Sequence, residues 1–105
     1  MASETIMVHS HGKHVKVITL NRPDHFNTFD STMSKELFET LEELDSDIPS
    51  RVIVIRGAGK SFCAGIDINE LGDKSAMASQ QWFEHMERPL ITISKMKTPV
   101  IAQVH

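Results

Sequence analysis

A short, wholly apolar run followed by a glycine-rich loop constrains this chain more than any other feature. Residues 52–55 read Val-Ile-Val-Ile, a pattern typical of a strand that is covered on both faces. The run leads into Gly-Ala-Gly at 57–59 and then into Lys-Ser-Phe-Cys-Ala-Gly-Ile-Asp-Ile at 60–68. A buried strand that ends in such a loop before a helix start leaves backbone N–H groups accessible. Because such groups can hold a developing oxyanion, residues 60–68 are a candidate wall of an active site.

The rest of the pattern predicts strands and helices in alternation. Residues 15–20 alternate in polarity and are rich in β-branched side chains, which indicates a strand. Residues 6–9 are its expected hairpin partner across a turn near residues 10–12, and residues 100–105 form a third buried strand. We therefore expect an α/β domain with a largely parallel sheet.

Two helices are predicted between these strands. The first is capped by Asp30 or Ser31 and ends at residues 47–50. Its apolar face consists of Met33, Leu37, Phe38, Leu41 and Leu44. The second begins at a Ser79 cap, and Pro89 inside it is expected to kink the helix or split it in two. Its apolar side chains are Trp82, Phe83, Met86, Leu90 and Ile93.

Composition limits the function classes. A chain of 105 residues is one small domain at most, or part of a larger one. Its net charge of −3 gives no basis for nucleic-acid binding, and no run approaches the roughly 20 apolar residues of a membrane span. The N-terminus lacks a signal or transit pattern and Cys63 is the single cysteine, so a cytoplasmic location is expected. A peroxisomal location stays open, because the chain stops near a strand end and is expected to continue.

Several segments, in this order along the chain, are similar to the N-terminal part of the enoyl-CoA hydratase/isomerase (crotonase) family. They are Ile-Thr-Leu-Asn-Arg-Pro at 18–23, Asn27, the helix with Met33 and Leu37, and residues 52–55 and 57–68. The resemblance covers residues 15 to 105. It implies a crotonase-like (ClpP/crotonase) α/β fold, a spiral of β-β-α units, of which residues 1–105 would be the truncated N-terminal part. It also implies assembly into trimers or hexamers.

The resemblance further implies an enzyme of fatty acid metabolism that acts on acyl-CoA thioesters, as a hydratase (a lyase) or an isomerase. Two backbone N–H groups would polarise the thioester carbonyl, so that an enolate forms without a metal or any cofactor beyond the coenzyme A moiety. Residue matching makes the Ile66 N–H the first donor, and places the second donor and the catalytic acids beyond His105. The substrate-binding residues would be Ala64, Gly65, Ile66, Asp67, Ile68, His25 and Phe26. Alone, these 105 residues should therefore be inactive.

Other reactions remain open. In the family, Ala is frequent at the position of Ile66 in hydratases, whereas Leu or Ile is common in isomerase-like members, so Ile66 slightly favours isomerisation. Thioester hydrolysis or carbon–carbon bond cleavage would use the same residues seen here. A non-catalytic crotonase-like binding scaffold is the alternative from a different class.

Possible catalytic side chains have simpler interpretations. Cys63 is favoured as buried packing over a nucleophile. Asp67 could be a base by position, but an acidic group that orders the loop and the next helix start is the preferred reading. Glu70, Glu84 and Glu87 could stand near an acyl chain, although a solvated helix face is favoured for them.

Possible ligand-binding side chains are also ambiguous. Three histidines near the predicted hairpin turn are expected to form an exposed strip and not a metal cluster: His9, His11 and His14. Arg22, His25 and Lys60 could equally meet phosphates or be ordinary surface cations. Core packing is favoured over the lining of an acyl tunnel for three side chains of the second helix: Trp82, Phe83 and Met86.

Overall fold

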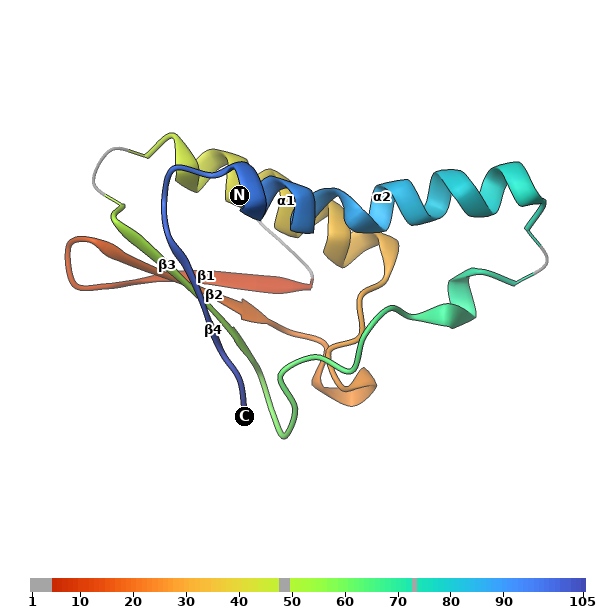
Figure 1. Ribbon diagram of the computed structural model, residues 1–105. Coiled ribbons are helices and arrows are strands. Elements are labelled where there is room, and N and C mark those ends of the chain that lie inside the picture. The colour runs from red at the N-terminus through yellow and green to blue at the C-terminus, as the bar shows by residue number, and fades with distance from the viewer. Residues whose placement is uncertain (1–4, 48–49, 73) are drawn as a thin grey trace.

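The computed structural model describes residues 5–47, 50–72 and 74–105. In these residues a four-stranded sheet with the order β1-β2-β3-β4 carries two helices over one face (Figure 1). The strands are β1 (Ile6–His11), β2 (Val15–Leu20), β3 (Val52–Gly57) and β4 (Val100–Gln103). The helices are α1 (Ser31–Asp45) and α2 (Ala76–Lys95), and two short 3-10 turns are η1 (Pro23–His25) and η2 (Ile68–Glu70).

The sheet has the predicted mixture of strand directions. β1 and β2 form an antiparallel hairpin, whereas β2 pairs with β3 and β3 with β4 in parallel. β1 continues to His11, so the hairpin turn starts at Gly12 and lies later than predicted. Gly12 has a φ of 71°, a conformation that glycine adopts without the steric cost of a side chain.

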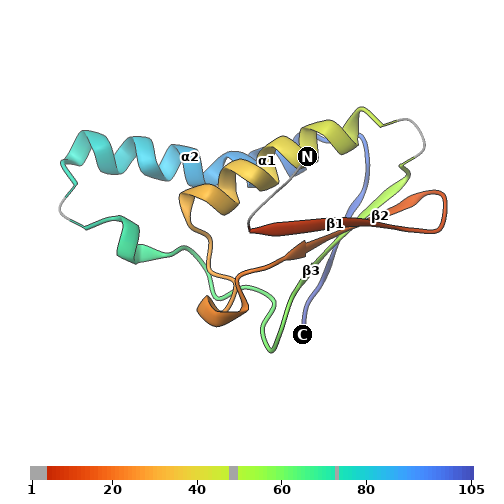
Figure 2. The ribbon, with the colours of Figure 1, turned by 180° about the vertical axis from the view of Figure 1, so that it is seen from behind.

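The core lies between the helices and one face of the sheet. Side chains alternate along β3, so Ile53 and Ile55 are buried beneath the helices while Val52 and Val54 on the opposite face are only half-buried. The core cluster is Ile6, Ile18, Leu20, Met33, Leu37, Leu41, Leu44, Ile53 and Ile55. Within the described chain, the prediction that residues 52–55 are covered on both faces is therefore wrong, as both views of the ribbon show (Figures 1 and 2).

The predicted third strand is shorter and more exposed than expected. β4 ends at Gln103, and Ile101 is 53% exposed. The reason is its place in the sheet, because among the described residues β4 is an edge strand whose only paired neighbour is β3. A run of apolar letters does not distinguish such an edge strand from a central one.

α1 begins where the sequence predicts. Asp30 is the cap of the two candidates, because its carboxylate accepts a hydrogen bond of 2.8 Å from the Met33 N–H while Ser31 is already the first helical residue. The helix ends at Asp45, and part of the predicted end at residues 47–50 lies outside the described residues.

α2 differs from its prediction at two points. It begins at Ala76, where the Ser75 hydroxyl accepts a hydrogen bond of 3.1 Å from the Ala78 N–H, so the predicted Ser79 cap is wrong. The first helical turn has apolar letters, but its one large apolar side chain, Met77, is 73% exposed and lies off the buried face. Pro89 is buried inside one continuous helix and does not split it. Neither α2 nor any other helix in the described part of the chain is long and apolar enough to cross a membrane.

Candidate functional site

The loop after β3 is held in place by a buried amide side chain. Asn27 is fully buried, and its Nδ2 donates to the carbonyl oxygens of Ala58 at 2.9 Å and Ser61 at 2.8 Å. Its Oδ1 accepts from the Arg22 N–H at 2.8 Å. The loop folds tightly back on the strand, since a Cβ on Gly57 would stand 2.5 Å from the Ser61 carbonyl oxygen. Glycine and asparagine at these two positions thus fix the path of the chain towards residue 66.

The backbone around Ile66 pairs with the segment before α1. Phe29 donates its N–H to the Gly65 carbonyl oxygen at 2.8 Å and accepts from the Asp67 N–H at 2.7 Å, which makes a parallel bridge between Phe29 and Ile66. Because neighbouring N–H groups of an extended chain point to opposite sides, the Ile66 N–H faces away from Phe29. No acceptor among the described residues takes a hydrogen bond from it. The φ of 112° at Gly65 is one that residues with a side chain rarely adopt.

A surface pocket of about 290 Å³ lies beside this backbone. It is lined by Asp24, His25, Phe26, Thr28, Ile66, Asp67, Ile68 and Asn69. Five of the seven predicted substrate-binding residues therefore come together, from segments that are about forty positions apart in the sequence. Ala64 and Gly65 lie outside the lining, and Ala64 instead donates its N–H to the Phe26 carbonyl oxygen at 3.0 Å. Phe26 and Ile68 are 60% and 74% exposed and offer apolar surface to a ligand.

Arg22 pairs with two carboxylates, and one of them, Asp67, lines the pocket. Its guanidinium lies 3.5 Å from Asp30 and 3.5 Å from Asp67, and it donates to the carbonyl oxygen of Thr28. With its side chain only 13% exposed, Arg22 holds the loop, so the interpretation as an ordinary surface cation is wrong for this residue, whereas contact with a phosphate stays a prediction. Asp67 also accepts from the Asn69 N–H at 3.1 Å and caps η2, which confirms its predicted role at a helix start.

Glu70 makes hydrogen bonds that the sequence pattern did not predict. Its Oε1 accepts from the Ser31 N–H at 2.8 Å and from the Trp82 Nε1–H at 3.2 Å, and its Oε2 accepts from the Ser31 hydroxyl at 2.9 Å. The prediction of a solvated helix face is therefore wrong for Glu70, although Glu84 and Glu87 are exposed on α2. No local pattern reveals these contacts, because they depend on three segments that meet only in the fold.

The remaining candidates occupy structural or solvent positions. Cys63 is half-buried, packs against the core and has its Sγ 3.9 Å from the Gly65 carbonyl oxygen. His9, His11 and His14 are exposed. Within residues 5–47, 50–72 and 74–105, no group of three or more His, Cys, Asp or Glu side chains is placed to hold a metal ion.

Three side chains of α2 divide between core and surface. Trp82 and Met86 are buried, with 8% and 2% of their surface exposed, which confirms core packing for both. Phe83 is 45% exposed and meets the Trp82 ring edge-on at a centroid distance of 4.9 Å. The core prediction is thus wrong for Phe83, because it lies on the outer side of the helix.

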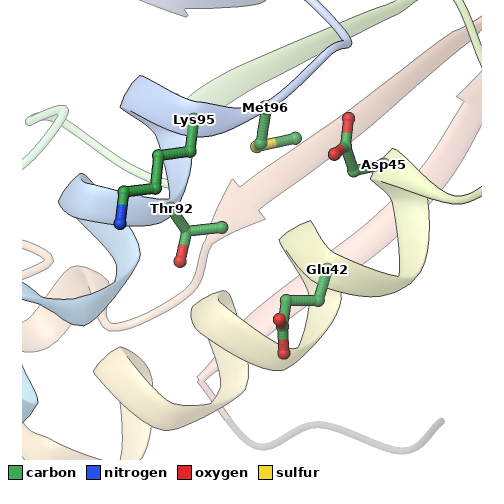
Figure 3. Close-up of a pocket in the computed structure, with 5 residues that line it drawn as sticks. All are labelled: Glu42, Asp45, Thr92, Lys95 and Met96. Atoms are coloured by element: carbon green, nitrogen blue, oxygen red, sulfur yellow. The ribbon is translucent and has the colours of Figure 1, made fainter.

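A second pocket, of about 240 Å³, lies between the C-terminal ends of the helices. Its lining is Glu42, Asp45, Thr92, Lys95 and Met96, and the Lys95 ammonium points away from Asp45 (Figure 3). Asp45 accepts hydrogen bonds of 3.0 Å from the N–H groups of Lys97 and Thr98. The bond from the Thr98 backbone is the main cause that lowers the pKa of Asp45 below its usual value. This carboxylate therefore serves the turn into β4, and the pocket is no candidate for catalysis.

Fold and site together define an α/β protein that presents a backbone donor beside a small surface pocket. A model of the family described as Enoyl-CoA hydratase/isomerase matches residues 10–105. The chain therefore belongs to the enoyl-CoA hydratase/isomerase family.

Two curated relatives illustrate the similarity. The mitochondrial Delta(3,5)-Delta(2,4)-dienoyl-CoA isomerase of Mus musculus is 32% identical over 97% of this chain and 35% of its own length. The 1,2-epoxyphenylacetyl-CoA isomerase of Escherichia coli (strain K12) is 35% identical over 89% of this chain and 37% of its own length. The chain thus spans little more than a third of each relative.

Solved structures agree on the architecture. An enoyl-CoA hydratase of Mycobacterium smegmatis superposes with a TM-score of 0.91 at 31% identity, over 98% of this chain and 40% of the other. The enoyl-CoA hydratase of Bacillus anthracis gives a TM-score of 0.89 at 27% identity, over 96% and 40%. The expected crotonase-like fold is therefore confirmed.

Proposed function

We propose that this chain is the acyl-CoA-binding part of an enzyme that stabilises a thioester enolate through backbone N–H groups. The observation that carries the proposal is the Ile66 N–H, which faces away from the Phe29 bridge beside a pocket whose lining is partly apolar and partly polar. A preorganised donor of this kind is a large catalytic term, since removing one costs roughly 2.7–4 kcal/mol in comparable sites.

The rest of the site fits a thioester ligand of mixed polarity. Phe26, Ile66 and Ile68 give apolar surface for the ligand, and the His25 ring adds a polar group at the rim. The pocket of about 290 Å³ is small for a whole acyl-CoA molecule, so we propose that further walls come from outside residues 5–105. The second oxyanion donor and the acid and base that move protons are proposed to lie there as well.

The reaction class proposed is hydration or double-bond isomerisation of an enoyl-CoA, with isomerisation slightly favoured. Relatives named as isomerases and relatives named as hydratases are both similar to this chain, so the slight preference rests on Ile at position 66. No metal or cofactor is proposed beyond the coenzyme A moiety of the substrate. Assembly into trimers or hexamers and a cytoplasmic location remain proposals. Relatives named as mitochondrial and peroxisomal make the organelles the alternative locations to test.

The test uses the protein expressed from its complete coding sequence. It should hydrate a 2-enoyl-CoA or convert a 3-enoyl-CoA into its 2-enoyl isomer, and should leave the corresponding free enoic acids unchanged. Hydrolysis of the thioester or cleavage of a carbon–carbon bond would instead assign it to another reaction of the same superfamily. Tight binding of an acyl-CoA without any turnover would contradict the proposal and favour a binding scaffold.

A further inference from the structure

One carboxylate joins the segment that carries Ile66 to both helices. Glu70 follows Ile66 by four positions and accepts hydrogen bonds from Ser31 at the start of α1 and from Trp82 on α2. In both ribbon views the N-terminal half of α2 extends past the sheet, above the η2 turn to which Glu70 belongs (Figures 1 and 2). Three elements thus meet at a single side chain.

Elementary electrostatics explains why a glutamate occupies this place. The first N–H groups of a helix lack intrahelical acceptors and carry the positive end of the helix dipole, so a carboxylate at Ser31 is favoured. The Trp82 side chain is buried, and an indole N–H in that position requires an acceptor. Glu70 satisfies both donors with Oε1 and receives the Ser31 hydroxyl on Oε2.

These contacts hold the segment around Ile66 at two points. The first point is the Phe29 bridge, whose hydrogen bonds to Gly65 and Asp67 flank Ile66 directly. The second point is the hydrogen bond from the Ser31 N–H to the Glu70 carboxylate. Ser31 follows Phe29 by two positions, so both anchors join the Ile66 segment to the same stretch of chain. The first anchor holds the peptide groups on either side of Ile66, and the second holds the same segment four residues further on. Together they limit how far the segment can turn the Ile66 N–H away from the pocket.

We infer that Glu70 is a positioning residue, which aims the Ile66 N–H at the ligand without touching the ligand itself. The inference rests on the proposed function, in which that N–H polarises a thioester carbonyl. It also assigns Glu70 no proton transfer, because three of the roughly four acceptor positions of its carboxylate already receive donors of the protein. Displacement of a catalytic group by about 1 Å can cost roughly 100-fold in rate. An anchor four residues from Ile66 can therefore affect the rate by holding the Ile66 N–H in place.

The test compares Glu70→Ala with Glu70→Gln in the protein expressed from its complete coding sequence. Glutamine can rebuild the network, since its Oε1 accepts from Ser31 and Trp82 while its Nε2 donates to the Ser31 hydroxyl. We expect Glu70→Ala to lower kcat by about 10- to 100-fold with KM changed much less, and Glu70→Gln to stay near the wild type. Glu87→Ala, at an exposed glutamate on α2, is the matched control and should have no effect.

Two results would overturn the inference. An equal loss of kcat in Glu70→Ala and Glu70→Gln would mean that the charge of the carboxylate takes part in the chemistry. Wild-type kcat in a folded Glu70→Ala would mean that the anchor is dispensable. If Glu70→Ala fails to fold, Ser31→Ala removes only the hydroxyl donor to Oε2 and should lower kcat in the same direction by a smaller factor. An unchanged kcat in that variant would also count against the inference.

A second readout separates this inference from the proposed function. The Asp67 N–H, which is bonded to the Phe29 carbonyl oxygen, should exchange with solvent at least about 10-fold faster in Glu70→Ala and at the wild-type rate in Glu70→Gln. If the wild-type protein turns over no acyl-CoA, the proposed function fails while exchange at Asp67 still decides whether Glu70 anchors the segment. Exchange that is unchanged in Glu70→Ala would contradict the anchor itself.

Discussion

The hydroxyl of Ser34 on α1 donates a hydrogen bond of 3.0 Å to the backbone carbonyl oxygen of His85 on α2. In a regular helix that carbonyl would accept from the N–H of the residue four positions later, which here is Pro89. Proline has no N–H, and its ring crowds the same carbonyl. Ser34 is fully buried and supplies the missing donor from the neighbouring helix, so the His85 carbonyl oxygen keeps a hydrogen-bond partner where α2 passes through Pro89.

Removing this donor should weaken the contact between the helices. We expect Ser34→Ala to lower the free energy of unfolding by about 1–2 kcal/mol, because the His85 carbonyl oxygen loses its partner in the interior. In a Pro89→Ala background the helix regains its own donor, so the same Ser34→Ala change should cost clearly less. Urea unfolding of the four proteins of this double-mutant cycle measures the difference. Equal costs in both backgrounds would show that the two residues are not coupled.

Replacing the Asn27 amide by the isosteric carboxylate of Asp should destabilise the protein. Asp at this position cannot donate to the carbonyl oxygens of Ala58 and Ser61 when ionised, and the charge would be fully buried. We expect Asn27→Asp to lower the free energy of unfolding by about 3 kcal/mol at pH 7, and by less in acid, where a protonated carboxyl can donate one bond. Asp24→Asn, at an exposed residue of the adjacent turn, is the reverse control and should be neutral. A cost that does not change with pH would contradict the assignment of a buried charge.

Asp45 should make stability depend on pH. Hydrogen bonds from the Thr98 and Lys97 backbones lower the pKa of Asp45 below its ordinary value of 3.8. A lowered pKa in the folded state gives stability that is fully present above pH 3.8 and is lost as the pH falls through the folded value. Asp45→Asn should therefore be less stable than the wild type at pH 7, and the difference should shrink towards about pH 2–3. Unfolding curves at both pH values measure it, and a gap that widens in acid would have the wrong sign.

The 105-residue polypeptide assayed by itself should show no enoyl-CoA turnover above background. It contains one proposed oxyanion donor, and its nearest glutamate, Glu70, is already engaged by Ser31 and Trp82. Proton transfer at a substrate needs an acid or base within hydrogen-bond reach, and we propose that this group, like the second donor, lies in further chain. A steady-state assay beside the product of the complete coding sequence tests this. Measurable hydration or isomerisation by the short polypeptide would contradict the proposal that part of the catalytic site lies outside these 105 residues.

The sequence predicts the elements of this fold well where periodicity and capping chemistry are local. The alternation at residues 15–20 and the apolar spacing of Met33, Leu37 and Leu41 are read directly from the letters. The start of α2 at Ala76 escapes prediction because Met77, the one large apolar side chain of its first turn, is 73% exposed and does not extend the apolar stripe of Trp82 and Met86. The continuity of α2 through Pro89 depends on Ser34, which is 55 positions away, and no local rule contains that contact.

The candidate site divides in the same way. Residues 64–68 stand out in the sequence because glycine, small residues and an acid precede a helix start. The roles of Arg22 and Glu70 do not, because an ion pair and a shared carboxylate depend on which segments the topology brings together. A charged residue in a polar stretch of sequence is most often exposed to solvent. This expectation fails for Arg22 and Glu70, because the fold provides each of them with partners inside the protein.

The central claim is that the Ile66 N–H polarises a thioester carbonyl, and replacing that N–H tests it most directly. An amide-to-ester substitution at Ile66 exchanges the N–H for an oxygen, keeps the side chain and leaves the bond from the Asp67 N–H to Phe29 unchanged, while the Phe29 N–H then meets an ester carbonyl at Gly65, which is a weaker acceptor. Ile66→Ala keeps the N–H and is the matched control. In the protein expressed from its complete coding sequence, the ester should lower kcat by about 100- to 1000-fold with the alanine variant far less affected. A kcat of the ester protein equal to that of the wild type would contradict the account.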